Sequence, residues 1–145
     1  MIKFKLNNRR YRIPERYTIS QWKQIVGLNS EDPRNWPKIL SIATQKPEWR
    51  FIAVNEDSLI LAVSLILSKL TSTIIECKVK DFTKLTLGEF VDLDIYMVTG
   101  VEKNIEAICG IIADEPVEYI GQALWLIGQY HNFRTSTYRS YAGLF

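Results

Sequence analysis

The side chains that could carry out catalytic chemistry are few in this sequence. His131 is its single histidine, and Cys77 and Cys109 are its two cysteines. A Ser-His-Asp triad or a histidine metal pair needs more partners than these. Each cysteine lies in an apolar stretch, where a buried free thiol is expected. His131 stands where a helix should end and its charge would favour the helix dipole, so we expect no catalytic residue, no cofactor and no metal ion.

The doublet Asp92-Leu93-Asp94 has the composition of a pair of metal ligands. On a helix, however, carboxylates two residues apart point about 200° away from each other. We therefore expect a solvated helix face at this doublet. The sequence also has no phosphate-binding or dinucleotide-binding glycine pattern, no nucleophile elbow and no zinc-ligand spacing. The motifs thus favour a protein that is not an enzyme.

A helix start that occurs twice organises the chain. It reads Thr-Ile-Ser-Gln-Trp from Thr18 and Thr-Leu-Gly-Glu-Phe from Thr86. In each copy Gln or Glu follows the threonine by three positions, which predicts a capping box. An apolar residue before the threonine and an aromatic residue four positions after it predict a hydrophobic staple. We therefore expect two similarly capped helices, over residues 19–27 and 86–98.

Residues 2–13 have the pattern of a β-hairpin. Asn7-Asn8 can adopt the positive φ angles of a two-residue turn. With Leu6 opposite Arg9, alternation places the apolar side chains on one face. The other face then carries four cations, Lys3, Lys5, Arg10 and Arg12. This face is either a solvated surface that discourages edge pairing or a contact for nucleic acid or an acidic protein.

The remaining elements complete an α+β domain. Apolar periodicity and proline positions predict helices over residues 36–44, 57–70, 102–113 and 116–131. The 57–70 helix is apolar nearly all round, so it should be the most buried. Residues 49–54 could be a strand or a loop, and residues 73–79 should be a strand that extends the hairpin to three or four strands. We expect this small sheet to pack against a mostly helical body of about five to six helices.

Composition is that of a globular protein. Hydrophobic residues make up 47% and charged residues 23% of the 145 residues, which fits one domain with its own core. The longest apolar stretch, Leu59 to Leu67, is too short to span a bilayer, and the N-terminus has no signal-peptide pattern. Two cysteines in apolar stretches are expected to be free thiols, as in proteins of a reducing compartment. We expect a single domain over residues 1–132 and no membrane partner.

Charge is distributed unevenly along the chain. Residues 1–50 hold eleven Lys and Arg against four acids, whereas residues 81–118 hold nine acids against two lysines. The opposite charges could neutralise each other within one fold. They could also let copies of the chain associate head to tail, or let the chain bind two different partners.

The segment after His131 changes character. Residues 133–145 contain no acid and alternate hydroxyls with aromatic residues and arginines. We interpret them as a C-terminal arm that either folds back over its own domain or docks on a neighbouring subunit, with Tyr and Arg as anchors. The candidate partner-binding residues of this arm are Phe133, Arg134, Tyr138, Arg139, Tyr141 and Phe145.

A resemblance adds to these interpretations. A short hairpin ending in Tyr11 to Pro14, followed by Thr-Ile-Ser-Gln-Trp, resembles the opening of small proteins encoded in the structural-gene region of tailed bacteriophages. The second copy, Leu-Thr-Leu-Gly-Glu-Phe-Val-Asp-Leu from Leu85, matches that pattern more closely. The resemblance covers these cap segments only and carries over no functional residue.

The resemblance implies a non-enzymatic structural subunit of a phage particle, in the tail, baseplate or head-tail connector region. Its partners in the virion would be copies of itself or other virion proteins. The alternative is a tail assembly chaperone or adaptor that acts in the host cytoplasm and is not retained in the mature particle. The cationic hairpin face also leaves open a nucleic-acid-associated protein.

Overall fold

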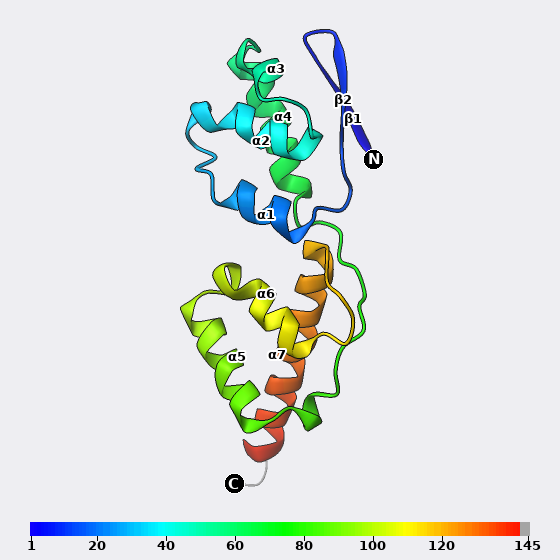
Figure 1. The fold of residues 1–145 in the computed structure, drawn as a ribbon, viewed down its shortest axis with the longest axis vertical. Coiled ribbons are helices and arrows are strands. Elements are labelled where there is room, and N and C mark those ends of the chain that lie inside the picture. Colours follow the sequence, from blue (N-terminus) through cyan, green and yellow to red (C-terminus); the bar gives the residue numbers. More distant parts are fainter. Residues whose placement is uncertain (143–145) are drawn as a thin grey trace. The chain divides into compact units, whose positions relative to one another are not determined.

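The chain folds into two strands and seven α-helices over the part that can be described (Figure 1). The structure, a computed structural model, describes the backbone of residues 1–142 and the side chains of residues 1–136. It confirms the expected α+β class, with a two-stranded N-terminal sheet and a helical body. The chain divides into two compact units, Met1–Thr73 and Ile74–Phe145. Each unit buries its own set of apolar side chains.

The first unit begins with the predicted hairpin, β1 (Ile2–Leu6) and β2 (Arg9–Ile13). Its register is confirmed, with Leu6 opposite Arg9 and Phe4 opposite Tyr11. Asn7 and Asn8 have φ angles of 48° and 63°, as a two-residue hairpin turn requires. The helices of this unit are α1 (Ile19–Val26), α2 (Trp36–Thr44), α3 (Trp49–Ile52) and α4 (Glu56–Lys69), with a 3₁₀ turn at Pro33–Asn35.

The core of the first unit lies between the helices and one face of the hairpin. Tyr11 contacts Phe51 of α3 with ring centroids 5.0 Å apart. Side chains with at most 1% exposure come from the hairpin, the segment that follows it and every helix of the unit. They are Ile13, Tyr17, Ile25, Ile39, Leu40, Phe51 and Ile66.

Helix α4 forms as predicted but is buried on one side only. Leu59, Ala62, Val63 and Ile66 face the core, while Leu61 is 73% exposed. An apolar sequence all round the helix predicts full burial. A unit of this size has too few neighbouring elements to cover every side of α4, so the opposite face remains at the surface.

The second unit is built from α5 (Leu87–Thr99), α6 (Val101–Ile112) and α7 (Ile120–Ala142) (Figure 1). A 3₁₀ turn at Phe82–Lys84 precedes α5. Gly100, with φ of 137°, separates α5 from α6. The fully buried side chains of these helices are Leu93, Ile105, Ile108, Ile112, Ile120, Ala123 and Leu126.

Residues 73–79 are not a strand, so the expected third strand is wrong and the sheet has two strands in the described backbone. The segment instead runs along the helices of the second unit. It makes an isolated bridge between Val79 and Ala113, and the Ile75 N–H donates to the Gly121 carbonyl. Its backbone groups thus find partners beside α6 and α7.

Two further boundaries differ from the predictions. Residues 49–52 form the short helix α3 rather than a strand or loop. Helix α7 begins at Ile120, not at residue 116. Glu115 accepts a hydrogen bond from the Lys78 N–H at 2.8 Å. The α7 start is capped later, by Gln122 Oε1, which accepts from the Tyr119 N–H.

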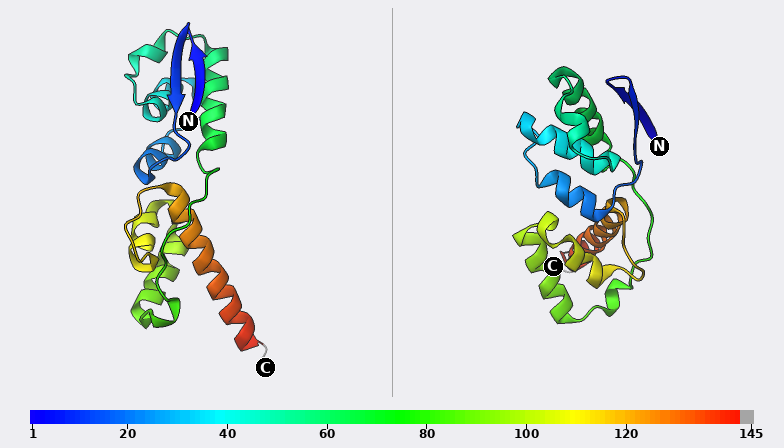
Figure 2. Two further views of the ribbon diagram at one scale, coloured as in Figure 1. Left: turned by 90° about the vertical axis from the view of Figure 1, so that its right-hand side faces the viewer. Right: turned by 45° about the horizontal axis from the view of Figure 1, so that its top comes forward.

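Helix α7 continues past His131 through Ala142 (Figure 2). Hydroxyl side chains in a helix can compete for its backbone groups. The Thr135 hydroxyl donates to the His131 carbonyl four residues back, at 2.9 Å, a bond that is compatible with a helix. The proximal part of the expected arm is thus a continuation of the last helix.

Candidate protein-contact surfaces

An exposed apolar stripe on α5 is the main candidate for a functional surface. The exposed fractions of its four side chains range from 48% to 87%. Spacings of four, four and three residues place them on one side of the helix. We call this set the α5 stripe: Leu87, Val91, Ile95 and Val98. Contiguous exposed apolar side chains of this kind mark interaction sites on soluble proteins.

The opposite side of α5 anchors the stripe. Leu93 is fully buried, and the Phe90 ring lies 6.4 Å from the Phe133 ring and 6.5 Å from the Tyr130 ring of α7, between centroids. With α5 held to α7 in this way, the stripe must face outward. Its exposure is therefore a consequence of core packing.

Both ends of α5 are fixed by local hydrogen bonds. The predicted capping box is present, since Thr86 Oγ1 accepts from the Glu89 N–H at 3.1 Å and Glu89 Oε1 accepts from the Thr86 N–H at 3.0 Å. The Thr86 backbone N–H lowers the pKa of Glu89 below its usual value. At the other end, Asn104 Nδ2 donates to the Tyr96 carbonyl at 3.2 Å and to the Gly100 carbonyl at 3.0 Å.

Two carboxylates flank the α5 stripe. Asp94 lies on one side of it and Asp92 on the other, because successive helical residues are about 100° apart. Arg134 of α7 donates to Asp94 at 3.2 Å, and its guanidinium lies 5.7 Å from the centre of the Phe90 ring. The expected solvated face at this doublet is confirmed, as both aspartates are exposed.

The described residues contain no cluster of side chains that could bind a metal ion. No three His, Cys, Asp or Glu side chains in that part of the chain lie close enough together to hold a metal ion. Cys77 and Cys109 are buried free thiols, as predicted. Burial raises the pKa of each to about 11, and for Cys77 a hydrogen bond to the Glu115 carboxylate adds to the effect.

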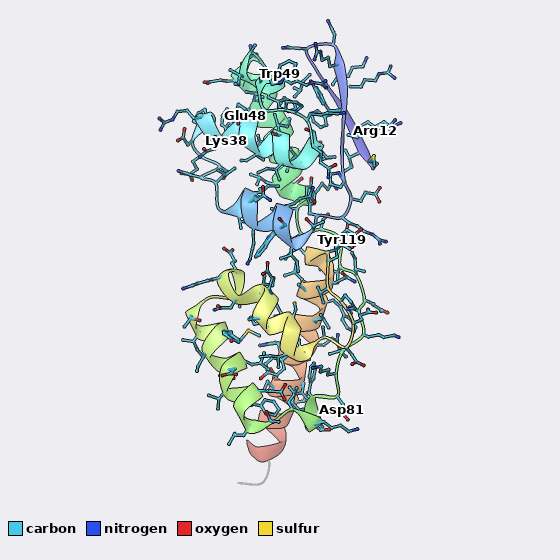
Figure 3. The ribbon with its side chains drawn as sticks, viewed as in Figure 1. Arg12, Lys38, Glu48, Trp49, Asp81 and Tyr119 are labelled. Atoms are coloured by element: carbon cyan, nitrogen blue, oxygen red, sulfur yellow. The ribbon has the colours of Figure 1, made fainter. Side chains whose placement is uncertain are left out.

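The cationic hairpin face is exposed, and the structure brings its four members together. Lys3 lies opposite Arg12 and Lys5 opposite Arg10. All four side chains are exposed, and Figure 3 shows Arg12 pointing away from the helices of its unit. The other face of the hairpin, with Leu6, packs inward.

The candidate residues of the C-terminal arm divide into two groups. Phe133 is half-buried and packs against Phe82, with ring centroids 5.2 Å apart. Arg134 pairs with Asp94. These two residues therefore fold back on their own unit. The side chains of the other candidates, Tyr138, Arg139, Tyr141 and Phe145, lie outside the described residues.

A second exposed apolar surface lies in the first unit. Trp49 and Ile52 of α3 are 63% and 65% exposed, and Figure 3 shows where Trp49 lies on this unit. Arg50 lies over the Trp49 ring at 5.7 Å. Sequence reasoning missed both this surface and the α5 stripe. The apolar spacing of the stripe was visible, but so was that of the buried side of α5, and periodicity alone does not distinguish them.

Two shallow depressions lie on the surface, and each includes charged side chains. One of about 330 Å³ lies between α1 and α2 and includes Lys38 and Glu48, both labelled in Figure 3. The other, of about 410 Å³, includes Asp81 and Glu89. The pKa of Asp81 is lowered by its hydrogen bonds to Thr83, as that of Glu89 is by Thr86. These carboxylates cap helical turns and are held in the charged form.

In comparisons with known proteins, the chain matches no family model, no curated protein and no solved structure. None of the helices in the described backbone is long and apolar enough to cross a lipid bilayer.

Proposed function

We propose that this chain is a non-enzymatic structural subunit of a tailed-phage particle that acts through protein-protein contacts. The α5 stripe carries the proposal. Its four apolar side chains are 48–87% exposed, and such a surface is costly to leave in water. The proposed place in the particle is the tail, baseplate or head-tail connector region, supported by the resemblance of the two cap segments.

The titratable groups support a role without catalysis. A general acid at neutral pH needs a raised carboxyl pKa. Asp81 and Glu89, in the depression near α5, instead have lowered pKa values. The thiols of Cys77 and Cys109 have pKa values of about 11, whereas a nucleophilic cysteine needs a lowered one.

The test is whether the chain is part of the mature particle. We expect mass spectrometry of purified particles to detect it, and Val91→Lys with Ile95→Lys to reduce its incorporation at least tenfold. Ala107→Lys, on an exposed position of α6, is the matched control and should be incorporated normally. A chain that is abundant in infected cells but absent from particles would contradict the proposal and favour the assembly chaperone or adaptor.

The cationic hairpin face favours a second candidate, a nucleic-acid-associated protein. Lys3, Lys5, Arg10 and Arg12 form one exposed surface. Binding through such a surface should weaken steeply with salt. Lys3→Glu with Arg12→Glu should then abolish retention on a nucleic-acid column at low salt. Unchanged retention of this double variant would eliminate this candidate.

A further inference from the structure

The apolar side chains of the α5 stripe and the negative charge around them restrict which partner surface fits it. Its apolar centre is flanked by Asp92 and Asp94, in a unit that holds ten acids against six Lys and Arg, a net charge of −4. Pairing of two α5 stripes would bring together two units of the same negative net charge. Like charges across an interface are unfavourable. The partner surface should therefore be apolar at its centre and basic around it.

The first unit presents a surface of that kind. It holds twelve Lys and Arg against six acids, a net charge of +6. Trp49 and Ile52 are its exposed apolar residues on α3, at 63% and 65%. Tryptophan is enriched among the residues that dominate interface energetics, so Trp49 is well suited to anchor a contact.

The hairpin packs on the helix that carries this apolar pair, and Arg50 of that helix lies over the Trp49 ring at 5.7 Å. Tyr11 of β2 packs on Phe51, with ring centroids 5.0 Å apart, and Phe51 stands between Trp49 and Ile52 in α3. Within the first unit, the hairpin turn and α3 lie at the same end in two views (Figures 1 and 2). We call this end the basic end: Lys5, Arg9, Arg10, Trp49 and Ile52.

We propose that the partner of the α5 stripe is the basic end of a second copy of this chain. Trp49 and Ile52 of one copy pack on Val91 and Ile95 of the next, and the cations of the basic end face the acidic second unit, where Asp94 already pairs with Arg134 and Asp92 is exposed. Because the two surfaces differ, the contact is heterologous and generates a ring or an open filament rather than a closed dimer. This inference rests on the proposed function and names the partner of the same surface.

The test uses two full-length variants, each blocked at one surface. Val91→Lys with Ile95→Lys blocks the α5 stripe, and Trp49→Glu with Ile52→Glu blocks the basic end. All four positions are exposed, so both variants should fold, which circular dichroism checks. Mass in solution is measured by light scattering between about 10 and 500 µM, a range in which contacts of modest area associate.

We expect the wild-type chain to form oligomers whose mass rises with concentration and falls with added salt, since complementary charges are screened. Each blocked variant should stay at its monomer mass of 16.8 kDa. An equimolar mixture should give a heterodimer of twice that mass and nothing larger, because only one compatible pair of surfaces remains.

Other outcomes overturn the inference. If the variant blocked at the basic end still dimerises alone, the α5 stripe pairs with itself. If the wild-type chain is monomeric throughout, the stripe is covered by a foreign protein or by its own chain. Neither result affects the proposed function. The proposed function fails only if mass spectrometry does not detect the chain in purified particles.

Discussion

Two threonines cap helices in the same way. Thr18 caps α1, the first helix of the first unit, and Thr86 caps α5 of the second unit. Thr18 Oγ1 accepts from the Gln21 N–H, and Thr86 Oγ1 accepts from the Glu89 N–H, both at 3.1 Å. In each case the N3 side chain accepts a hydrogen bond from the threonine backbone in return. Four backbone or side-chain groups thus fix the direction in which each helix leaves the preceding segment.

The matched caps provide a residue-scale prediction. Thr86→Ala should lower the free energy of unfolding of the second unit by about 1 kcal/mol, because one N–H at the α5 start loses its partner. Amide hydrogen exchange in α5, α6 and α7 measures the loss. Thr18→Ala is the control and should have a similar effect in the first unit. Loss of protection in the unit without the substitution would contradict the prediction.

The thiols give a second prediction at this scale. With pKa values of about 11 for Cys77 and Cys109, only about one thiol in a thousand is ionised at pH 8. Because the thiolate is the reactive form, labelling by a disulfide reagent at pH 8 should be at least 100-fold slower in the native protein than in urea. Cys77→Ala and Cys109→Ala assign the rates, and fast native labelling at either site would contradict the prediction.

At the scale of elements, the exposed sides of α4 and α5 are the unusual features. Both helices carry apolar residues on two sides, of which only one can face a core. On α4 the outer side includes Leu61 at 73% exposure, and on α5 it includes Val98 at 87%. Helices of this composition suit elements that become buried when an assembly forms.

Helix α7 offers an element-scale prediction by truncation. Ending the chain after Asn132 should reduce the free energy of unfolding of the second unit by about 2 kcal/mol, because Phe133 no longer packs on Phe82 and Phe90. Ending it after Ser136 keeps Phe133 and Arg134 and is the control. Urea unfolding measures both, and equal stability of the two truncations would show that Phe133 contributes nothing.

At the scale of the whole molecule, the chain consists of two units of opposite net charge, each with its own core. Ile39 and Phe51 are fully buried in the first unit, and Ile105 and Ile108 are fully buried in the second. A chain of this length could form one larger core. Dividing it into two smaller cores leaves more apolar surface exposed.

Separate cores predict separate responses to mutation. Ile108→Ala should destabilise the second unit by about 3 kcal/mol through a cavity and leave hydrogen exchange in α1, α2 and α4 unchanged. Ile39→Ala is the reciprocal variant and should affect the first unit alone. Faster exchange in both units from either substitution would contradict independent cores.

Local sequence patterns determined the hairpin register, the two capping boxes and helix α2. Each depends on residues only a few positions apart: alternation places Phe4 opposite Tyr11, and Thr86 meets Glu89 within one helical turn. The α+β class follows from such patterns. The charge difference between the two units is likewise a property of the sequence itself.

Only the tertiary structure decided where the chain divides, which side of α5 is exposed, and what residues 73–79 and Phe133 contact. An apolar side chain on a two-sided helix has the same local sequence whether it packs in a core or lies at the surface. Its burial depends on elements distant in sequence, here α7 against α5 through Phe133 and Phe90. The candidate site is the side of α5 that this packing leaves uncovered.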